Sequence, residues 1–219
     1  KEIKRIKIYI ENSASNQGYF DGATQFKTMM GDLVRIAENN IADSIEIDIY
    51  FIAKDIQKFD GNGFEFIKYM STDKVAKGEG YPLGEMFSEI QKNYKTGEVI
   101  LFVSDCILSH SDSEIRNNKE INKEAASSAL KAGIAYVFEE FKEKGVSSSI
   151  YAFSSEFNGE YFNYKNERKG KKISEVRPYY LWVIAEPENM NKVQSALKEN
   201  SSFKPEQELH FGTSREPIE

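Results

Sequence analysis

Hydrophobic residues along this chain follow two different periods, and the two kinds of segment alternate. Isoleucines at positions 6, 8 and 10 alternate with Lys7 and Tyr9, a period of two that predicts a strand. From Asp21 to Asn40, apolar residues recur every three or four positions, which predicts a helix with one face toward a core. The same two patterns predict strands over 44–52, 99–103, 149–153 and 176–184, and helices beginning at Pro82 and spanning 121–144 and 187–200.

This alternation of strands and helices predicts an α/β fold. We expect a three-layer sandwich, with a mostly parallel central sheet and helices on both faces. The run Val99 to Val103 is apolar at every position, as expected for a strand in the middle of a sheet that is covered on both sides. No repeat or low-complexity linker interrupts the chain before about Asn200. We therefore expect one domain over residues 1–200, with residues 201–219 as a tail or the stub of a following domain.

The segment 154–172 alternates aromatic and polar residues around Asn158-Gly159 and Lys169-Gly170, which predicts a hairpin. Its rings and the nearby basic residues would also suit nucleic-acid or glycan binding, but alternating rings in a hairpin more often pack one face onto a sheet. Pro178 indicates that the last predicted strand is an edge strand, or that the proline stands at its start.

The charge balance argues against nucleic acid as a partner. The 219 residues include 29 Lys and Arg and 35 Asp and Glu, so no basic excess is available to neutralise phosphates. The single cysteine, Cys106, excludes an intramolecular disulfide and a cysteine-based zinc site. A chain with so few cysteines fits either the cytoplasm or an extracytoplasmic location, and we slightly favour the extracytoplasmic location. No apolar run approaches the roughly 20 residues that span a bilayer. Because the chain opens KEIKRIK, we expect a processed form or an excised fragment.

Polar residues follow two of the predicted strands directly. The first strand runs into Glu11-x-Ser13-x-Ser15, and the apolar strand over 99–103 runs into Ser104-Asp105. Carboxylate and hydroxyl oxygens suit a hard divalent cation such as Mg²⁺, Mn²⁺ or Ca²⁺. The first loop is also explained as a Ser/Asn-rich turn that caps the next helix. If the two strands are neighbours in the sheet, Glu11, Ser13, Ser15 and Asp105 converge at their carboxyl ends, where open α/β sheets bind ligands.

These motifs resemble the von Willebrand factor A (vWA) family with its metal-ion-dependent adhesion site (MIDAS). That family has a strand ending in Asp-x-Ser-x-Ser, an amphipathic helix, and a later apolar strand ending in an aspartate. Ser13 and Ser15 match the two hydroxyl ligands, Glu11 takes the place of the leading aspartate, and Asp105 matches the later aspartate. Tyr81 stands where the family has a ligating threonine, and a phenol is a poor substitute. The combination also looks like a glutamate-led variant found in uncharacterised bacterial chains.

The resemblance implies binding rather than turnover. In such domains the cation keeps one coordination position open, and a carboxylate from a protein partner fills it. Two alternatives remain: a scaffold domain that has lost the ion, and a Mg²⁺-dependent hydrolase or phosphotransferase that uses Glu11 and Asp105 around the metal. Against catalysis, the chain has no phosphate-binding loop and no nucleophile elbow. We interpret His110 as a solvated loop residue and Cys106 as a packing residue.

Overall fold

The computed structural model describes residues 2–41, 45–72, 75–107, 123–161 and 171–212. Within these residues, seven strands form one sheet in the order β3-β2-β1-β4-β6-β5-β7. The strands are β1 (Arg5–Glu11), β2 (Glu46–Ile52), β3 (Ile56–Lys58), β4 (Glu98–Ser104), β5 (Ser147–Tyr161), β6 (Lys171–Ala185) and β7 (Gln207–Phe211). The predicted α/β class is therefore confirmed.

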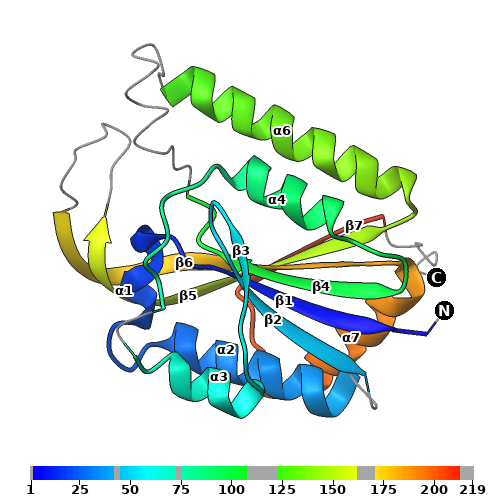
Figure 1. Ribbon diagram of the computed structural model, residues 1–219, viewed down its shortest axis with the longest axis horizontal. Helices are drawn as coiled ribbons and strands as arrows, with labels where there is room; N and C mark the ends of the chain where they lie inside the picture. The colour runs from blue at the N-terminus through cyan, green and yellow to red at the C-terminus, as the bar shows by residue number, and fades with distance from the viewer. Residues whose placement is uncertain (1, 42–44, 73–74, 108–122, 162–170, 213–219) are drawn as a thin grey trace.

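Helices cover both faces of this sheet (Figure 1). Figure 1 shows α4 and α6 on one face, and α2, α3 and α7 on the other. The α-helices are α1 (Gln17–Phe20), α2 (Gln25–Ile36), α3 (Gly63–Tyr69), α4 (Leu83–Lys92), α6 (Lys123–Glu143) and α7 (Pro187–Glu199). A 3₁₀ turn, η1 (Ala14–Asn16), precedes α1, and a π-helical turn, η2 (Ala37–Ile41), continues α2.

The expectation of a mostly parallel sheet is wrong. β1 runs parallel to both of its neighbours, β2 and β4, but the other four pairings in the sheet are antiparallel. The reason lies in the second half of the chain, where β5 and β6 pair directly as a long hairpin instead of being joined by a crossover helix. Since β6 then lies beside β4, the hairpin imposes antiparallel pairing on that side of the sheet.

Alternate side chains of β1 lie on opposite faces of the sheet. Ile6, Ile8 and Ile10 are fully buried in the larger core, which lies between the sheet and α2, α3 and α7. Tyr9 belongs to the smaller core, where Phe87 of α4 and Phe141 of α6 pack over β4. Glu11 shares the parity of Tyr9 and Lys7, so the polar residues of β1 all lie on the α4 side.

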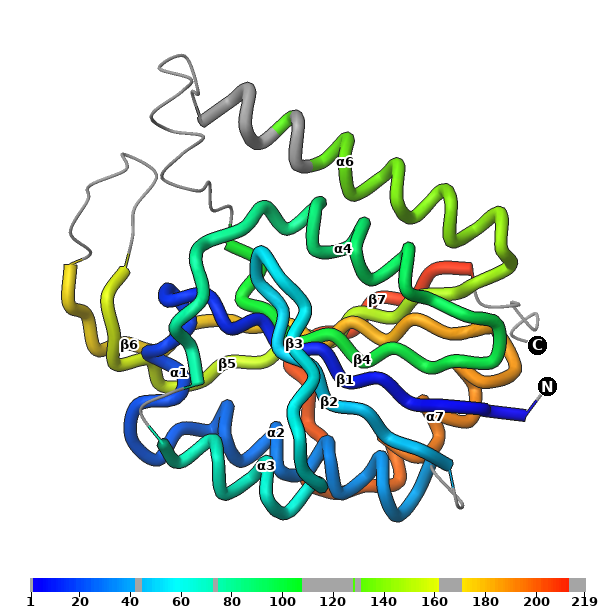
Figure 2. Tube along the Cα trace, viewed as in Figure 1, coloured from blue at the N-terminus to red at the C-terminus, as the bar shows by residue number. Residues whose placement is uncertain are grey.

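The β5–β6 hairpin extends well beyond the rest of the sheet. Its strands pair from Ser147–Ala185 to Tyr161–Lys171, whereas β4 pairs with β6 only as far as Ser104–Tyr180. We call residues 154–161 and 171–178 the distal arm. Figure 2 shows the arm curving beside α1, and a Cβ atom at Gly159 would lie only 2.6 Å from Gly18 Cα. The arm therefore packs directly on the α1 backbone.

Two details of the hairpin differ from the sequence prediction. Asn158-Gly159 does not form a turn but lies inside β5, where glycine permits the close approach to α1. The Lys169-Gly170 pair lies outside the described residues. Pro178 lies inside β6, opposite Ser154 and beyond the last pair with β4, so β6 has only one neighbour there. The edge-strand interpretation of Pro178 therefore holds locally.

The segment that we expected to be a tail contributes to the same sheet. β7 pairs antiparallel with β5, from Ser148–Phe211 to Ala152–Gln207. His210 of β7 also contacts Ser149 of β5, with 2.8 Å between Nδ1 and Oγ. Of the residues that the structure describes, none belongs to a helix that is long and apolar enough to cross a membrane.

Candidate metal centre

The two polar loops singled out in the sequence do meet. β1 and β4 are parallel neighbours in register, with Ile10 opposite Val103, so the strands reach the same edge of the sheet with Glu11 and Ser104. Glu11 is 2% exposed and Asp105 is 5% exposed. The predicted convergence of the first loop with the end of the central strand is therefore confirmed.

Hydroxyl groups hold the Glu11 carboxylate from two sides. Ser13 Oγ donates to Glu11 Oε1 at 2.6 Å, and Ser104 Oγ donates to Glu11 Oε2 at 2.5 Å. Ser15 Oγ lies 2.9 Å from Ser13 Oγ. Because a serine has one hydroxyl proton and Ser13 gives its proton to Glu11, Ser15 is the donor in this second contact. The motif thus forms one connected cluster of oxygen atoms around Glu11.

The loop that carries the serines is fixed by the backbone of Gly78. Ala14 N donates to Gly78 O at 2.8 Å, and Gly78 N donates to Asn12 O at 2.9 Å. A Cβ atom at Gly78 would lie 2.9 Å from Ala53 Cβ, which explains why glycine fits this close approach.

The alternative interpretation of this loop, as a Ser/Asn-rich cap of the following helix, is wrong. Ser13 and Asn16 occupy the N-cap positions of η1 and α1, but neither side chain makes a capping hydrogen bond. Thr24 is the residue that caps α2. The hydroxyl of Ser13 is directed at a buried carboxylate instead, which is an arrangement that helix capping does not require.

Asp105 is held by one of its two carboxylate oxygens. Oδ1 accepts from Ile107 N at 2.9 Å, while the buried Oδ2 has no hydrogen-bond partner among the described residues. The next residue, Cys106, has a φ of 54°, an uncommon value for a residue other than glycine, and its N–H donates to Ser104 Oγ at 2.8 Å. Unusual backbone of this kind is concentrated at ligand sites, where the surrounding contacts maintain it.

Burial of two neighbouring carboxyl groups raises the pKa of each. Burial raises the pKa of Asp105 to about 8, and the neighbouring Glu11 charge adds to this effect. Burial also raises the pKa of Glu11, although its hydrogen bonds from Ser104, Ser13 and Asn16 act in the opposite direction. Neither carboxylate forms an ion pair with another described residue.

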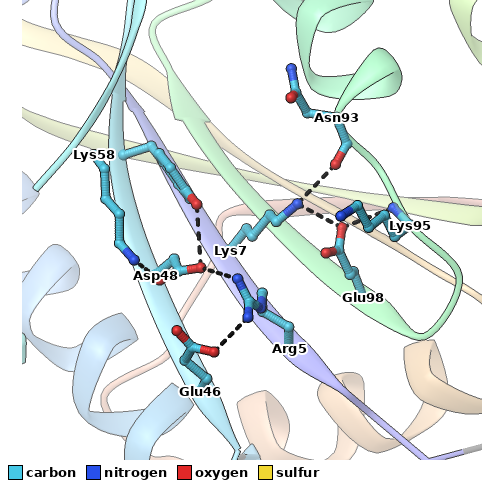
Figure 3. A network of polar contacts seen from close by, with 9 residues as sticks. Arg5, Lys7, Glu46, Asp48, Lys58, Asn93, Lys95 and Glu98 are labelled. Carbon is cyan, nitrogen blue, oxygen red and sulfur yellow. Dashed lines mark hydrogen bonds and ion pairs between the residues drawn. The ribbon is translucent and has the colours of Figure 1, made fainter.

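Other buried charges on the same face of the sheet are paired, as Figure 3 shows. Asp48 is 2% exposed and pairs with Lys58 at 2.6 Å and Arg5 at 2.9 Å. Lys7 pairs with Glu98 at 2.8 Å, and its ammonium group also donates to the backbone carbonyl of Asn93, the residue that follows α4. The fold thus supplies counter-ions for buried charges near the amino-terminal ends of β1 and β4, but supplies none by direct contact at their carboxyl ends.

The donor set suits a hard cation. Two carboxylates and the serine hydroxyls offer oxygen atoms only, and Asp105 Oδ2 is an orphaned acceptor within this cluster. No group of three or more His, Cys, Asp or Glu side chains suited to a metal occurs among the described residues, so a cation here depends on hydroxyl ligands beside the two carboxylates. Tyr81, which the resemblance placed at a ligand position, is half-buried and packs against the core beneath α4 and α6.

Some residues of this centre were missed in the sequence. Ser104 was recognised as a polar residue at the end of its strand but not as part of the centre, although it shares the parity of Phe102 and Ile100 and so lies on the same face as Glu11. The charge of Arg177 in the distal arm lowers the pKa of Asp105, and the charge of Asp105 raises the pKa of Tyr19 in α1; no local pattern reveals such long-range neighbours. His110 lies outside the described residues.

Cys106 has the properties of a packing residue. Trp182 Nε1 donates to its sulfur at 3.4 Å, and burial raises the pKa of the thiol to about 12. Because the thiolate is the nucleophilic form, this environment disfavours a role in covalent catalysis.

Comparisons with known proteins do not identify the chain. No family model matches it, and neither the curated proteins nor the solved structures include a match.

Proposed function

We propose that this chain is a vWA-like binding domain that holds a divalent cation through Glu11, Ser13, Ser15 and Asp105. In this proposal, the cation keeps a coordination position open for a carboxylate of a protein partner. The observation that carries the proposal is the contrast between the buried carboxylates of this sheet. Asp48 has direct cationic partners, whereas Glu11 and Asp105 are equally buried and have none among the described residues.

The physical argument rests on charge compensation. A buried carboxylate without a counter-ion is strongly unfavourable, and two adjacent ones are worse, so either a proton or a cation must compensate them. A proton would satisfy one oxygen, but it would not explain the serine hydroxyls gathered around Glu11. Mg²⁺ suits the cluster because it accepts hydroxyl and carboxylate oxygens and usually retains several waters, which an exchangeable partner carboxylate can replace.

Binding is favoured over hydrolysis or phosphoryl transfer because the described part of the site contains no histidine and no reactive thiol. His210, the one histidine within the described residues, contacts Ser149 at β7 on the sheet edge. Cys106 is a buried thiol with a raised pKa.

Calorimetric titration of the chelator-treated chain with Mg²⁺, Mn²⁺ and Ca²⁺ tests the proposal. We expect binding of at least one ion, and we expect Asp105→Asn and Ser13→Ala each to weaken it by about tenfold or more, since each removes or displaces a ligand. Asp48→Asn is the matched control, because it neutralises a similarly buried carboxylate of the same sheet that already has cationic partners.

Absence of binding for all three ions would refute the metal site. Equal loss of binding in Asp48→Asn would show that the effect follows from general destabilisation of the sheet. Turnover of a phosphoester substrate that disappears in Glu11→Gln would instead favour the hydrolytic alternative.

A further inference from the structure

The distal arm brings one arginine close to the candidate metal centre. Tyr180 of β6 lies opposite Ser104, the last residue of β4, so Arg177 lies three residues further along β6, beyond the end of β4. Its charge acts on Asp105 and on Tyr19, lowering their pKa values against the effect of burial. Arg177 therefore stands beside the same edge of the sheet as the oxygen cluster.

Aromatic rings of the arm hold the Arg177 side chain. Its guanidinium carbon lies 4.4 Å from the centroid of the Tyr161 ring and 5.6 Å from that of Phe157. Only 16% of the side chain is exposed. Phe157 is fixed in turn by an edge contact with Tyr19, whose hydroxyl donates to Pro178 O at 2.7 Å. The guanidinium is thus restrained before any ligand arrives, which reduces the entropy lost on binding.

The carboxylates of the candidate metal centre do not pair directly with the positive charge of Arg177. Arg177 forms no ion pair with Glu11 or Asp105 among the described contacts, and its ion-pair partner is Glu175, at 2.7 Å. The Glu175 side chain is 51% exposed, so an incoming carboxylate can reach this pair and compete with Glu175 for the guanidinium. Arg177 is therefore available to an anion that approaches the cation.

We propose that Arg177 determines partner specificity by pairing with a second carboxylate of an acidic partner segment, while a first carboxylate binds the cation. This inference rests on the proposed function and adds the chemistry of the partner. The whole chain has a formal charge of −6, which repels acidic partners in general. Recognition of an acidic segment consequently needs local positive charge, and a planar guanidinium beside the cation supplies it with a geometry matched to carboxylate.

The test uses the full chain loaded with Mn²⁺, with acetate and glutarate as the monocarboxylate and dicarboxylate probes. Fluorescence of Trp182 reports binding, because it is the single tryptophan and its indole contacts Cys106 beside Asp105. We expect the wild-type chain to bind glutarate more tightly than acetate. Arg177→Gln should weaken glutarate binding about three- to tenfold, the range for one partly exposed charge pair, and leave acetate and Mn²⁺ binding within about twofold.

Two further variants separate the specific role from loss of charge or fold. Lys171→Gln removes the same charge from the same strand at an exposed position and should change neither probe. Arg177→Lys keeps the charge but lacks the planar fork, and we expect it to lose at least half of the glutarate preference. It also replaces Arg177→Gln as the test if that variant fails to fold.

The outcomes are distinct for the two proposals. Failure of the wild-type chain to bind Mn²⁺ overturns the metal site and this inference together. Three results would overturn the role of Arg177 and leave the metal site standing, provided that the wild-type chain binds Mn²⁺. These are a wild-type chain that shows no preference for glutarate, Arg177 variants that keep the full preference, and Arg177 variants that lose affinity for acetate and glutarate equally.

Discussion

Asp105→Asn provides the most direct test of the electrostatic reasoning. The substitution preserves the size and shape of the side chain, and its carbonyl can still accept from Ile107 N, but it removes the charge from beside Glu11. If burial of two adjacent carboxyl groups is as unfavourable as the geometry indicates, the metal-free variant should be more stable than the wild-type chain at high pH.

The sign and size of the effect follow from the two states of Asp105. In the unfolded chain its pKa is about 3.9, whereas in the folded chain it is raised to about 8. Between these values the folded state retains a proton that the unfolded state has lost, so stability falls as the pH rises from about 4 to 8 and then levels off. A shift of about four pKa units corresponds to at most about 5 kcal/mol, because coupling to Glu11 spreads the effect over both groups.

Urea denaturation in the presence of a chelator, at pH 5, 7 and 9, measures this dependence. We expect Asp105→Asn to exceed the wild-type chain by only about 1.5 kcal/mol at pH 5 and by several kcal/mol at pH 9. The reasoning is refuted if the variant is no more stable than the wild-type chain at pH 9.

Asp48→Asn is a control for which we expect the opposite effect on the free energy of unfolding. Burial raises the pKa of Asp48, but the hydrogen bond and charge of Lys58 and the charge of Arg5 outweigh burial, so the pKa is lowered overall. That group stabilises the fold above its unfolded pKa of about 3.9 and loses this contribution as the pH falls through its lower folded pKa. Asp48→Asn should therefore be destabilising at pH 7, with little difference from the wild-type chain at the lowest pH where it remains folded.

Three other substitutions or treatments test the packing and the charges. Lys7→Met should lower the free energy of unfolding, measured by urea denaturation, by about 3 kcal/mol, because it leaves Glu98 buried without its cation. Adding Glu98→Gln to the same chain should restore part of this loss. Gly159→Ala should cost about 1–3 kcal/mol in the same assay, because its Cβ would overlap the Gly18 backbone, and an unchanged midpoint would contradict this packing. Alkylation of Cys106 by iodoacetamide at pH 8, followed by mass spectrometry, should be about a thousandfold slower than for an exposed thiol; a rate near that of free cysteine would show that the thiol is not buried.

Several elements were predictable because their pattern is local. The isoleucines of β1, the apolar run of β4 and the apolar stripe of α2 each fix both the type of element and the face that it buries. In each of these elements, the spacing of the apolar residues along the chain already shows which side chains are buried together.

The direction of β6 was not predictable in this way. A strand has the same hydrophobic period whether it pairs parallel or antiparallel, so the segment 176–184 was recognised as a strand but its orientation was not. Orientation follows from the direct pairing with β5 over 15 residues, which depends on contacts between distant segments. Gly159 is a similar case, because only its approach to Gly18 explains why it lies within a strand.

The sequence by itself determined the α/β class, the central position of β4 and the oxygen-bearing residues at the ends of β1 and β4. These follow from short-range periodicity and from the chemistry of side chains next to a buried strand. Only the tertiary structure decided that Ser104 completes the cluster around Glu11, that Asp105 retains an unpaired buried oxygen, and that Arg177 stands beside them. The physical reason is that charge compensation depends on distances between segments that are far apart in the chain, and no local pattern contains those distances.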